Sequence, residues 1–132
     1  MVNVEEVRST LTLKSIGFGE IHFVRRESEN KENIIGIRVA DPKIDGDQFE
    51  VLVQAQIQGE GTYQLDVSLK AVFSIEGGLR EENAFMLTNA VAIMFPYLRS
   101  EITLLTSQPG MNPVVLPPIN VREVMKKRNK QS

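Results

Sequence analysis

The fold is decided by residues 48–75, which read QFEVLVQAQIQGEGTYQLDVSLKAVFSI. Within residues 49–57 and 63–75, apolar side chains take every second position, and all but two of the residues between them are polar. This alternation is typical of antiparallel strands with one face in a core and the other in water. The loop Gly59-Glu60-Gly61 suits a hairpin between the two strands.

Two more strands are expected upstream of this hairpin. Alternate apolar residues mark one of them: Ile35, Ile37 and Val39. Asp45-Gly46 supplies a turn that joins this strand to the one beginning at Phe49, so three strands form a meander. A fourth strand is expected within residues 7–25. Its apolar residues fall into two phases, and a bulge near Gly17 and Gly19 would bring them onto one face.

The period changes to a helical one after Gly77-Gly78. Residues 81–106 carry apolar side chains three and four positions apart, which predicts one stripe facing the core. Its members are Ala84, Leu87, Val91, Met94, Leu98, Ile102 and Leu105. Thr88 and Asn89 are suitable N-caps, which predicts a short helix followed by a longer one. Pro96 should kink the longer helix because it removes a backbone donor.

The C-terminal part of the chain is divided by prolines. Pro109, Pro113, Pro117 and Pro118 predict an extended connector. Asn120 is then placed to cap a short final helix that runs through Met125 and Arg128. The fold class is therefore α+β, with a four-stranded, meander-like antiparallel sheet followed by a long helical region and a short C-terminal helix.

Composition is typical of a soluble globular domain. The chain has 132 residues, of which 42% are hydrophobic and 24% charged, with a formal net charge of −2. We expect one domain over residues 1–132, with strands at about 7–76, helices at about 80–128 and a basic tail at 126–132. The weak net charge gives no field that would attract nucleic acid, and the basic tail has no aromatic side chains on which bases could stack.

No catalytic or metal-binding pattern is present in the sequence. Cysteine is absent, and a single histidine, His22, leaves no zinc or iron ligand set. No phosphate-binding loop, nucleophile elbow or zinc-protease motif occurs. The N-terminal residues do not resemble a signal peptide, and no apolar run could span a bilayer. We therefore expect a cytoplasmic protein that is not an enzyme, has no cofactor or metal and does not insert into a membrane.

The run of six apolar residues at positions 90–95 is unusual for a helix on a single sheet. A helix that is apolar on all sides is buried on all sides. Two explanations are open. Either the connector and the last helix of the same chain cover the run, or a second subunit packs against Ala92 and Ile93.

Two segments carry a resemblance to a known family. They are Met-Phe-Pro-Tyr-Leu-Arg-Ser-Glu-Ile at residues 94–102 and Leu-Pro-Pro-Ile-Asn at residues 116–120. The chain resembles the SecB export chaperones in these segments, around Phe73-Ser74-Ile75, and more weakly around Glu20-Ile21-His22-Phe23. About half of the chain matches well. The resemblance implies a bacterial, ATP-independent holdase that binds unfolded polypeptides for export and assembles as a homotetramer, a dimer of dimers.

The resemblance also implies roles for particular residues. In SecB proteins the groove for clients lies between the helices, the connector and a neighbouring strand. The matching residues here are Met86, Phe95, Tyr97, Met111, Val114, Val115, Leu116 and Ile119. Each of them is equally compatible with ordinary packing in the core or between subunits. Leu65 and Val67 occupy positions that help to hold the tetramer together in the family.

The resemblance implies that Glu20 and Asp66 dock the SecA motor. Two departures weaken this expectation. Val24 stands where the family has a further acid, and the chain ends in Lys126-Lys127-Arg128-Asn129-Lys130-Gln131-Ser132 instead of an acidic or neutral tail. Three functions therefore stay open: a chaperone for export, a chaperone dedicated to one client such as a toxin–antitoxin pair, and a structural or adaptor protein that has lost client binding.

Overall fold

The structure, a computed structural model, describes residues 1–3, 11–25, 34–59, 63–76 and 85–131. Some predicted features lie outside these residues. They are the beginning of the first strand near Val7, loop residues 60–61, the Gly77-Gly78 break and helical residues 81–84.

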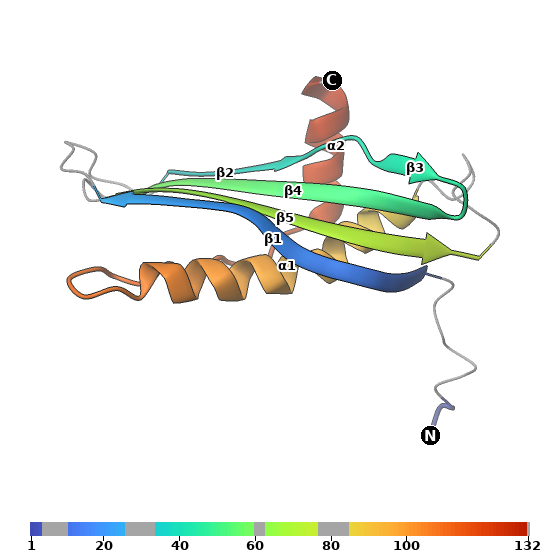
Figure 1. Cartoon of the computed structure of the whole chain (residues 1–132), viewed down its shortest axis with the longest axis horizontal. Helices are drawn as coiled ribbons and strands as arrows, with labels where there is room; N and C mark the ends of the chain where they lie inside the picture. Colours follow the sequence, from blue (N-terminus) through green and yellow to red (C-terminus); the bar gives the residue numbers. More distant parts are fainter. Residues whose placement is uncertain (4–10, 26–33, 60–62, 77–84, 132) are drawn as a thin grey trace.

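The described strands form one antiparallel sheet (Figure 1). They are β1 (Leu11–Arg25), β2 (Ile34–Val39), β3 (Lys43–Asp45), β4 (Gln48–Gly59) and β5 (Tyr63–Ile75). The order is β1-β5-β4-β2, and β3 also pairs with β4. The expected sheet is confirmed, with short β3 as an additional strand.

The edge of the sheet beside β4 is shared by β2 and β3, with Pro42 between them. Proline has no backbone N–H to give to a strand ladder, which explains why the edge is divided there. The chain then turns at Gly46, whose φ of 61° lies in the left-handed region that glycine adopts readily. The predicted Asp45-Gly46 turn is thereby confirmed.

The alternation in β4 and β5 separates the two faces of the sheet. The residues at odd-numbered positions are buried in both strands, whereas the polar residues between them face outward. The register places Phe49 opposite Phe73, and their rings stack with centroids 5.6 Å apart. Apolar burial of this kind contributes about 1.5–3 kcal/mol for each large side chain. The paired strands thus supply one wall of the core.

The first strand, β1, contains two register shifts relative to β5. One lies between Phe18 and Glu20, where Gly19 is the extra residue, as the sequence predicts. The other lies between Leu13 and Ser15 and has no glycine to announce it. Together the two shifts keep the apolar residues of β1 on one face of the sheet. Apolar residues before, between and after the shifts all stand opposite buried residues of β5.

A single helix, α1 (Phe85–Thr106), follows the sheet. The predicted division into a short and a longer helix is wrong, since Thr88 and Asn89 both lie inside α1. Pro96 also lies inside the helix. Because proline has no N–H, the carbonyl of Ala92, four residues earlier, has no helical donor. Pro96 and Ala92 are both exposed, so water can donate to this carbonyl instead.

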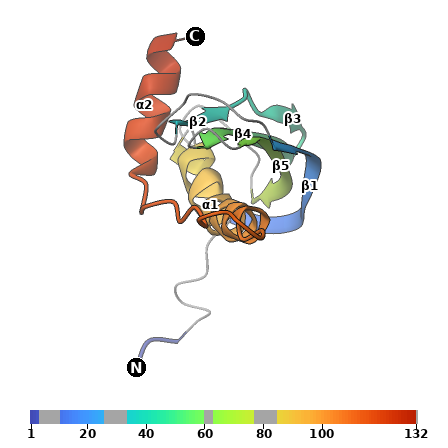
Figure 2. The same cartoon turned by 90° about the vertical axis from the view of Figure 1, so that its left-hand side faces the viewer.

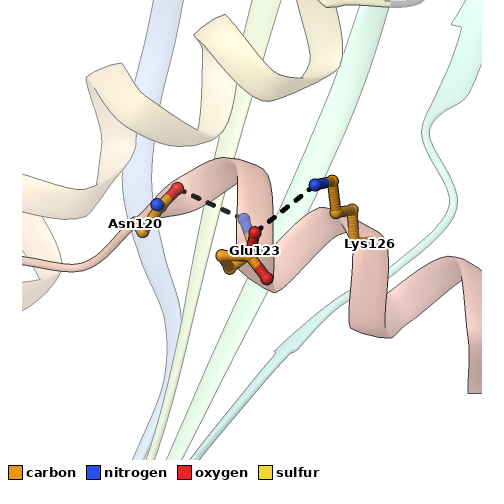
Figure 3. A network of polar contacts seen from close by, with 3 residues as sticks. All are labelled: Asn120, Glu123 and Lys126. Atoms are coloured by element: carbon orange, nitrogen blue, oxygen red, sulfur yellow. Dashed lines mark hydrogen bonds and ion pairs between the residues drawn. The ribbon is translucent and has the colours of Figure 1, made fainter.

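The last helix, α2 (Val121–Gln131), begins where Asn120 caps it. Oδ1 of Asn120 accepts a hydrogen bond from the backbone N–H of Glu123 at 3.3 Å (Figure 3). Glu123 in turn pairs with Lys126 at 3.4 Å. The predicted cap is confirmed, and it fixes the point at which the connector becomes a helix.

The two helices lie in different positions relative to the sheet (Figure 2). The sheet curls over α1, whose buried side presents Ala90, Met94, Leu98 and Ile102 to the core. The predicted stripe is confirmed for its described members, with Leu105 partly buried. In contrast, α2 stands beside the β2 edge and contacts both β2 and α1. One side of the sheet is therefore covered by α1, and no described helix covers the other side.

Gly59, at the end of β4, is expected to be intolerant of a side chain. It is buried, and a Cβ at this position would overlap with the ring of Tyr63, which stacks on Phe23 with centroids 5.6 Å apart. Gly59→Ala should therefore lower the free energy of unfolding by about 1–3 kcal/mol, measured by urea titration. Gly36→Ala, where a Cβ meets open space, is the control. Equal effects at the two positions would contradict this packing.

Candidate functional site

The connector between the helices is held in place by the last turn of α1. The hydroxyl of Thr103 donates to the carbonyl of Val114 at 2.8 Å, and the hydroxyl of Thr106 accepts from the N–H of Val114 at 2.8 Å. Both backbone groups of Val114 are thus satisfied by threonine side chains. Nearer the beginning of the connector, Nη1 of Arg25 donates a hydrogen bond to the carbonyl of Pro109 at 3.1 Å. The extended connector predicted from the prolines is present and anchored at two points.

A groove of about 620 Å³ runs between β2 and α2. Its apolar wall comes from the helix-facing side of β2 and from one residue of α2: Ile35, Ile37, Val39 and Val124. Its charged lining consists of Arg38, Asp41, Lys127 and Arg128. Although Ile35 lies opposite buried Ile57 of β4, 39% of its surface is exposed. The core is therefore open to solvent along this edge.

Among the described residues, no strand pairs with the side of β2 that faces away from β4. Ala40 donates its N–H to Leu52 of β4, and strand residues point their backbone groups alternately to either side. Those of Ile35, Ile37 and Val39 therefore point away from β4. Nε of Arg128 donates to the carbonyl of Val39 at 2.9 Å, while its Nη2 pairs with Asp41. Arg128 thus occupies one end of the free edge.

The groove residues implied by the resemblance are distributed over three environments. Phe95, Val114 and Leu116 are buried in the core. Met86, Met111 and Ile119 are partly buried against the core. Tyr97 and Val115 are exposed. Val115 lines a separate shallow hollow on α1, not the β2–α2 groove.

The β2 and α2 residues of the groove do not match any site that the sequence predicts. One signal was present in the sequence. Ile34 and Ile35 are adjacent, so β2 carries apolar side chains on both faces, which a half-buried strand does not require. Ile34 and Ile35 are both exposed.

The outer face of the sheet carries Glu20 and Asp66, the two acids for which the resemblance implies SecA docking. Glu20 stands opposite Ser68, and Asp66 stands opposite His22. Both acids line one shallow hollow of about 580 Å³, and Arg38 lines it as well. Asp66 also accepts a hydrogen bond from Nε2 of Gln64 at 3.3 Å. The acids are therefore close together, but they lie among basic and neutral side chains.

The residues predicted for a subunit interface lie in two places. Leu65 and Val67 are buried in the core beneath the sheet, so their side chains form no surface in this chain. Ala92 and Ile93 are exposed on α1. The other four residues at positions 90–95 are buried within the chain. The chain's own packing therefore covers most of the apolar run but leaves Ala92 and Ile93 uncovered by the described residues.

The described parts of the chain contain neither a metal-ligand cluster nor a membrane-spanning helix. No three His, Cys, Asp or Glu side chains gather there as metal ligands would. Of the helices in these parts, none combines the length and the apolar character that crossing a bilayer requires.

The family of the chain follows from a comparison with family models. The model described as Preprotein translocase subunit SecB matches residues 12–132. The chain belongs to the SecB family. This confirms the resemblance drawn from residues 94–102 and 116–120, and it places the chain in a family of chaperones, not of enzymes.

Two curated relatives cover the chain to different extents. The protein-export protein SecB of Nitrosospira multiformis is 28% identical over 111 residues, which are 80% of this chain and 70% of that protein. An uncharacterized protein of Methanocaldococcus jannaschii is 43% identical over 51 residues, or 39% of this chain. That match spans only 33% of the length of the archaeal protein.

Two solved structures share the SecB-family fold of this chain. One is a SecB-like chaperone of Mycobacterium tuberculosis in complex with a ChAD peptide from an antitoxin. It has a TM-score of 0.64 at 16% identity and covers 83% of this chain and 91% of its own. The other, a protein of unknown function from Streptococcus agalactiae, has a TM-score of 0.51 at 11% identity and covers 82% and 97%, respectively. At sequence identities of 16% and 11%, the similarity to these two structures concerns the fold alone.

Proposed function

We propose that this SecB-family protein is a nucleotide-independent holdase that binds non-native polypeptide in the β2–α2 groove. The observation that carries the proposal is the β2 edge, where Ile35 and Ile37 present apolar side chains together with backbone groups that no described strand pairs. An unfolded chain exposes the same two kinds of group. Strand addition would pair both at once.

The chemistry of the groove suits many clients. Main-chain hydrogen bonds do not depend on the client sequence, and apolar contacts with Ile35, Ile37 and Val124 require only that alternate client residues be apolar. The connector that follows α1 is anchored through Val114. It is therefore already ordered before a client binds, so binding has no entropy cost of ordering it.

The cellular role and the assembly are part of the same proposal. Export is supported by the family and by the relative from Nitrosospira, and a dedicated client is supported by the antitoxin peptide bound to the mycobacterial neighbour. We propose a cytoplasmic homotetramer in which Ala92 and Ile93 meet a second copy. Docking of SecA at Glu20 and Asp66 is proposed only with the export role.

The test compares two substitutions at one position of the free edge. Ile35→Pro removes an N–H that points away from β4, so it should leave the β2–β4 ladder intact. Ile35→Ala keeps the N–H and shortens the side chain. Each variant is titrated into a model protein diluted from denaturant, and aggregation and refolding are followed without ATP. We expect the wild type to suppress aggregation and Ile35→Pro to bind the client about 3–10-fold more weakly than Ile35→Ala.

Circular dichroism and oligomer mass, measured for all three proteins, show whether the sheet and the assembly survive the substitutions. With both unchanged, equal binding by Ile35→Pro and Ile35→Ala would refute strand addition. No suppression of aggregation by the wild type at a large excess would refute the holdase function and favour the adaptor alternative.

A further inference from the structure

We infer that the hollow around Arg99, on the outer side of α1, is a second binding site for extended polypeptide and takes a segment in which a carboxylate stands beside apolar residues. The inference rests on the proposed function but concerns a surface outside the β2–α2 groove. The hollow has a volume of about 610 Å³ and lies between one side of α1 and Val115 of the connector. Its other lining residues are Pro96, Arg99, Ser100, Thr103, Leu104 and Ser107.

The positive charge of Arg99 has no partner within the described parts of the chain. Its side chain is half-buried, and its Nε is completely buried without a hydrogen-bond partner. Arg99 also forms no ion pair with a described residue, and no acid lines the hollow. A guanidinium stays charged at any ordinary pH, and removing it from water without a partner costs free energy. A carboxylate from another molecule would supply that partner, because its two oxygens match the fork of the guanidinium.

Most of the hydroxyl groups in the hollow are already used within the chain. The hydroxyl of Thr103 donates to the carbonyl of Val114 at 2.8 Å, and that of Ser107 donates to the carbonyl of Thr103 at 2.6 Å. Of the polar side chains that line the hollow, Arg99 and the adjacent Ser100 therefore remain available as donors. Donors without an acceptor among them favour an anionic ligand.

Val115 indicates that the ligand is an extended segment. Its surface is 67% exposed, and neither its N–H nor its carbonyl has a hydrogen-bond partner among the described residues. Thr103 and Thr106 hold the neighbouring Val114 in place, so this backbone is ordered before a ligand arrives. An extended chain can pair with such a backbone and lay an apolar side chain on Leu104, which is 64% exposed. A helix of a second copy cannot form this pairing, because its backbone groups bond to one another.

The inference can be tested with three fluorescent peptides. They share one segment in which valine alternates with threonine, and they differ at one central position, which is glutamate, glutamine or lysine. Binding to the intact protein is measured by fluorescence anisotropy. We expect the glutamate peptide to bind about 3–10-fold more tightly than the glutamine peptide, and the lysine peptide to bind most weakly. The ratio should persist in Ile35→Pro, which weakens binding in the β2–α2 groove.

Substitution of Arg99 identifies the source of the preference. Arg99→Met removes the charge and keeps an unbranched side chain, so the glutamate and glutamine peptides should bind about equally. Lys14→Met changes the net charge by the same amount on exposed β1, outside the hollow, and should leave the ratio unchanged. Val115→Ser should weaken all three peptides and preserve their order. Circular dichroism and oligomer mass are measured for every variant, and Val115→Ser, at an exposed position, still tests the site if Arg99→Met does not fold.

The outcomes separate this inference from the proposed function. Equal affinities of the glutamate and glutamine peptides for the wild type would refute the carboxylate site and leave the holdase function standing. An equal loss of preference in Lys14→Met would refute it as well, since net charge would then be the cause. If Arg99→Met changes the oligomer mass and not the ratio, the partner of Arg99 is a second copy, and the inference is wrong. If no peptide binds, the inference is wrong, and the proposed function fails with it only if client capture is also absent.

Discussion

Leu98→Ala is expected to lower the free energy of unfolding by about 2–5 kcal/mol. Leu98 is completely buried on the side of α1 that faces the sheet, at the centre of the stripe formed with Met94 and Ile102. Truncation removes apolar contacts and leaves a cavity that the surrounding strands can fill only in part. Urea titration followed by circular dichroism measures the loss, and an unchanged slope shows that the compared states are the same.

The same helix offers a matched control for this substitution. Leu104 is 64% exposed, so Leu104→Ala should change the free energy of unfolding by no more than about 0.5 kcal/mol in the isolated chain. A small effect at Leu98 would contradict the packing of α1 on the sheet. A large effect at Leu104 that grows with protein concentration would instead indicate that a second copy covers the outer side of α1.

Thr106→Val is the second substitution with a large expected effect, a loss of about 1–3 kcal/mol. Thr106 is fully buried, and its hydroxyl connects α1 to the connector. It donates to the carbonyl of Ile102 at 2.7 Å and accepts from the N–H of Val114 at 2.8 Å. Valine has nearly the same shape but no hydroxyl, so the buried N–H of Val114 would lose its partner.

Thr106→Ser separates the hydroxyl from the shape of the side chain. Serine keeps the hydroxyl and loses a methyl group, so it should retain most of the stability that valine loses. Thermal unfolding of both variants measures the difference, and amide hydrogen exchange at Val114 tests its cause. Protection of that amide should fall in Thr106→Val and persist in Thr106→Ser. The reverse order of stability would show that packing, and not the hydrogen bond, holds the connector.

The parts of the fold that follow from local pattern were predictable from sequence. The alternation in residues 48–75 gave the central hairpin, and Asn120 gave the start of α2. The predicted division of the helical region at Thr88 or Asn89 is wrong, because a residue type that suits an N-cap is also accepted inside a helix. In α1 they sit between Leu87 and Ala90, whose burial continues the helix through them.

The site was less predictable because it depends on contacts between distant segments. Arg128 and Val39 are 89 residues apart in the sequence, and no local pattern places them together. The apolar residues of the connector were recognised as important, but a sequence does not say which side of an extended segment faces the core. Val114 and Leu116 face inward, and Val115 between them is 67% exposed.

The interruption of the sheet edge at Pro42 has a consequence for self-association. A protein with a long open edge risks pairing with further copies of itself into an extended fibrous sheet. Here the described stretch of β2 is six residues long, and Arg128 and Asp41 close its end at Val39. If clients bind here as proposed, a stretch of this length would accept one short segment and would be a poor template for a growing stack. The division at Pro42 therefore limits pairing between copies along this edge, whereas the opposite edge strand, β1, spans 15 residues.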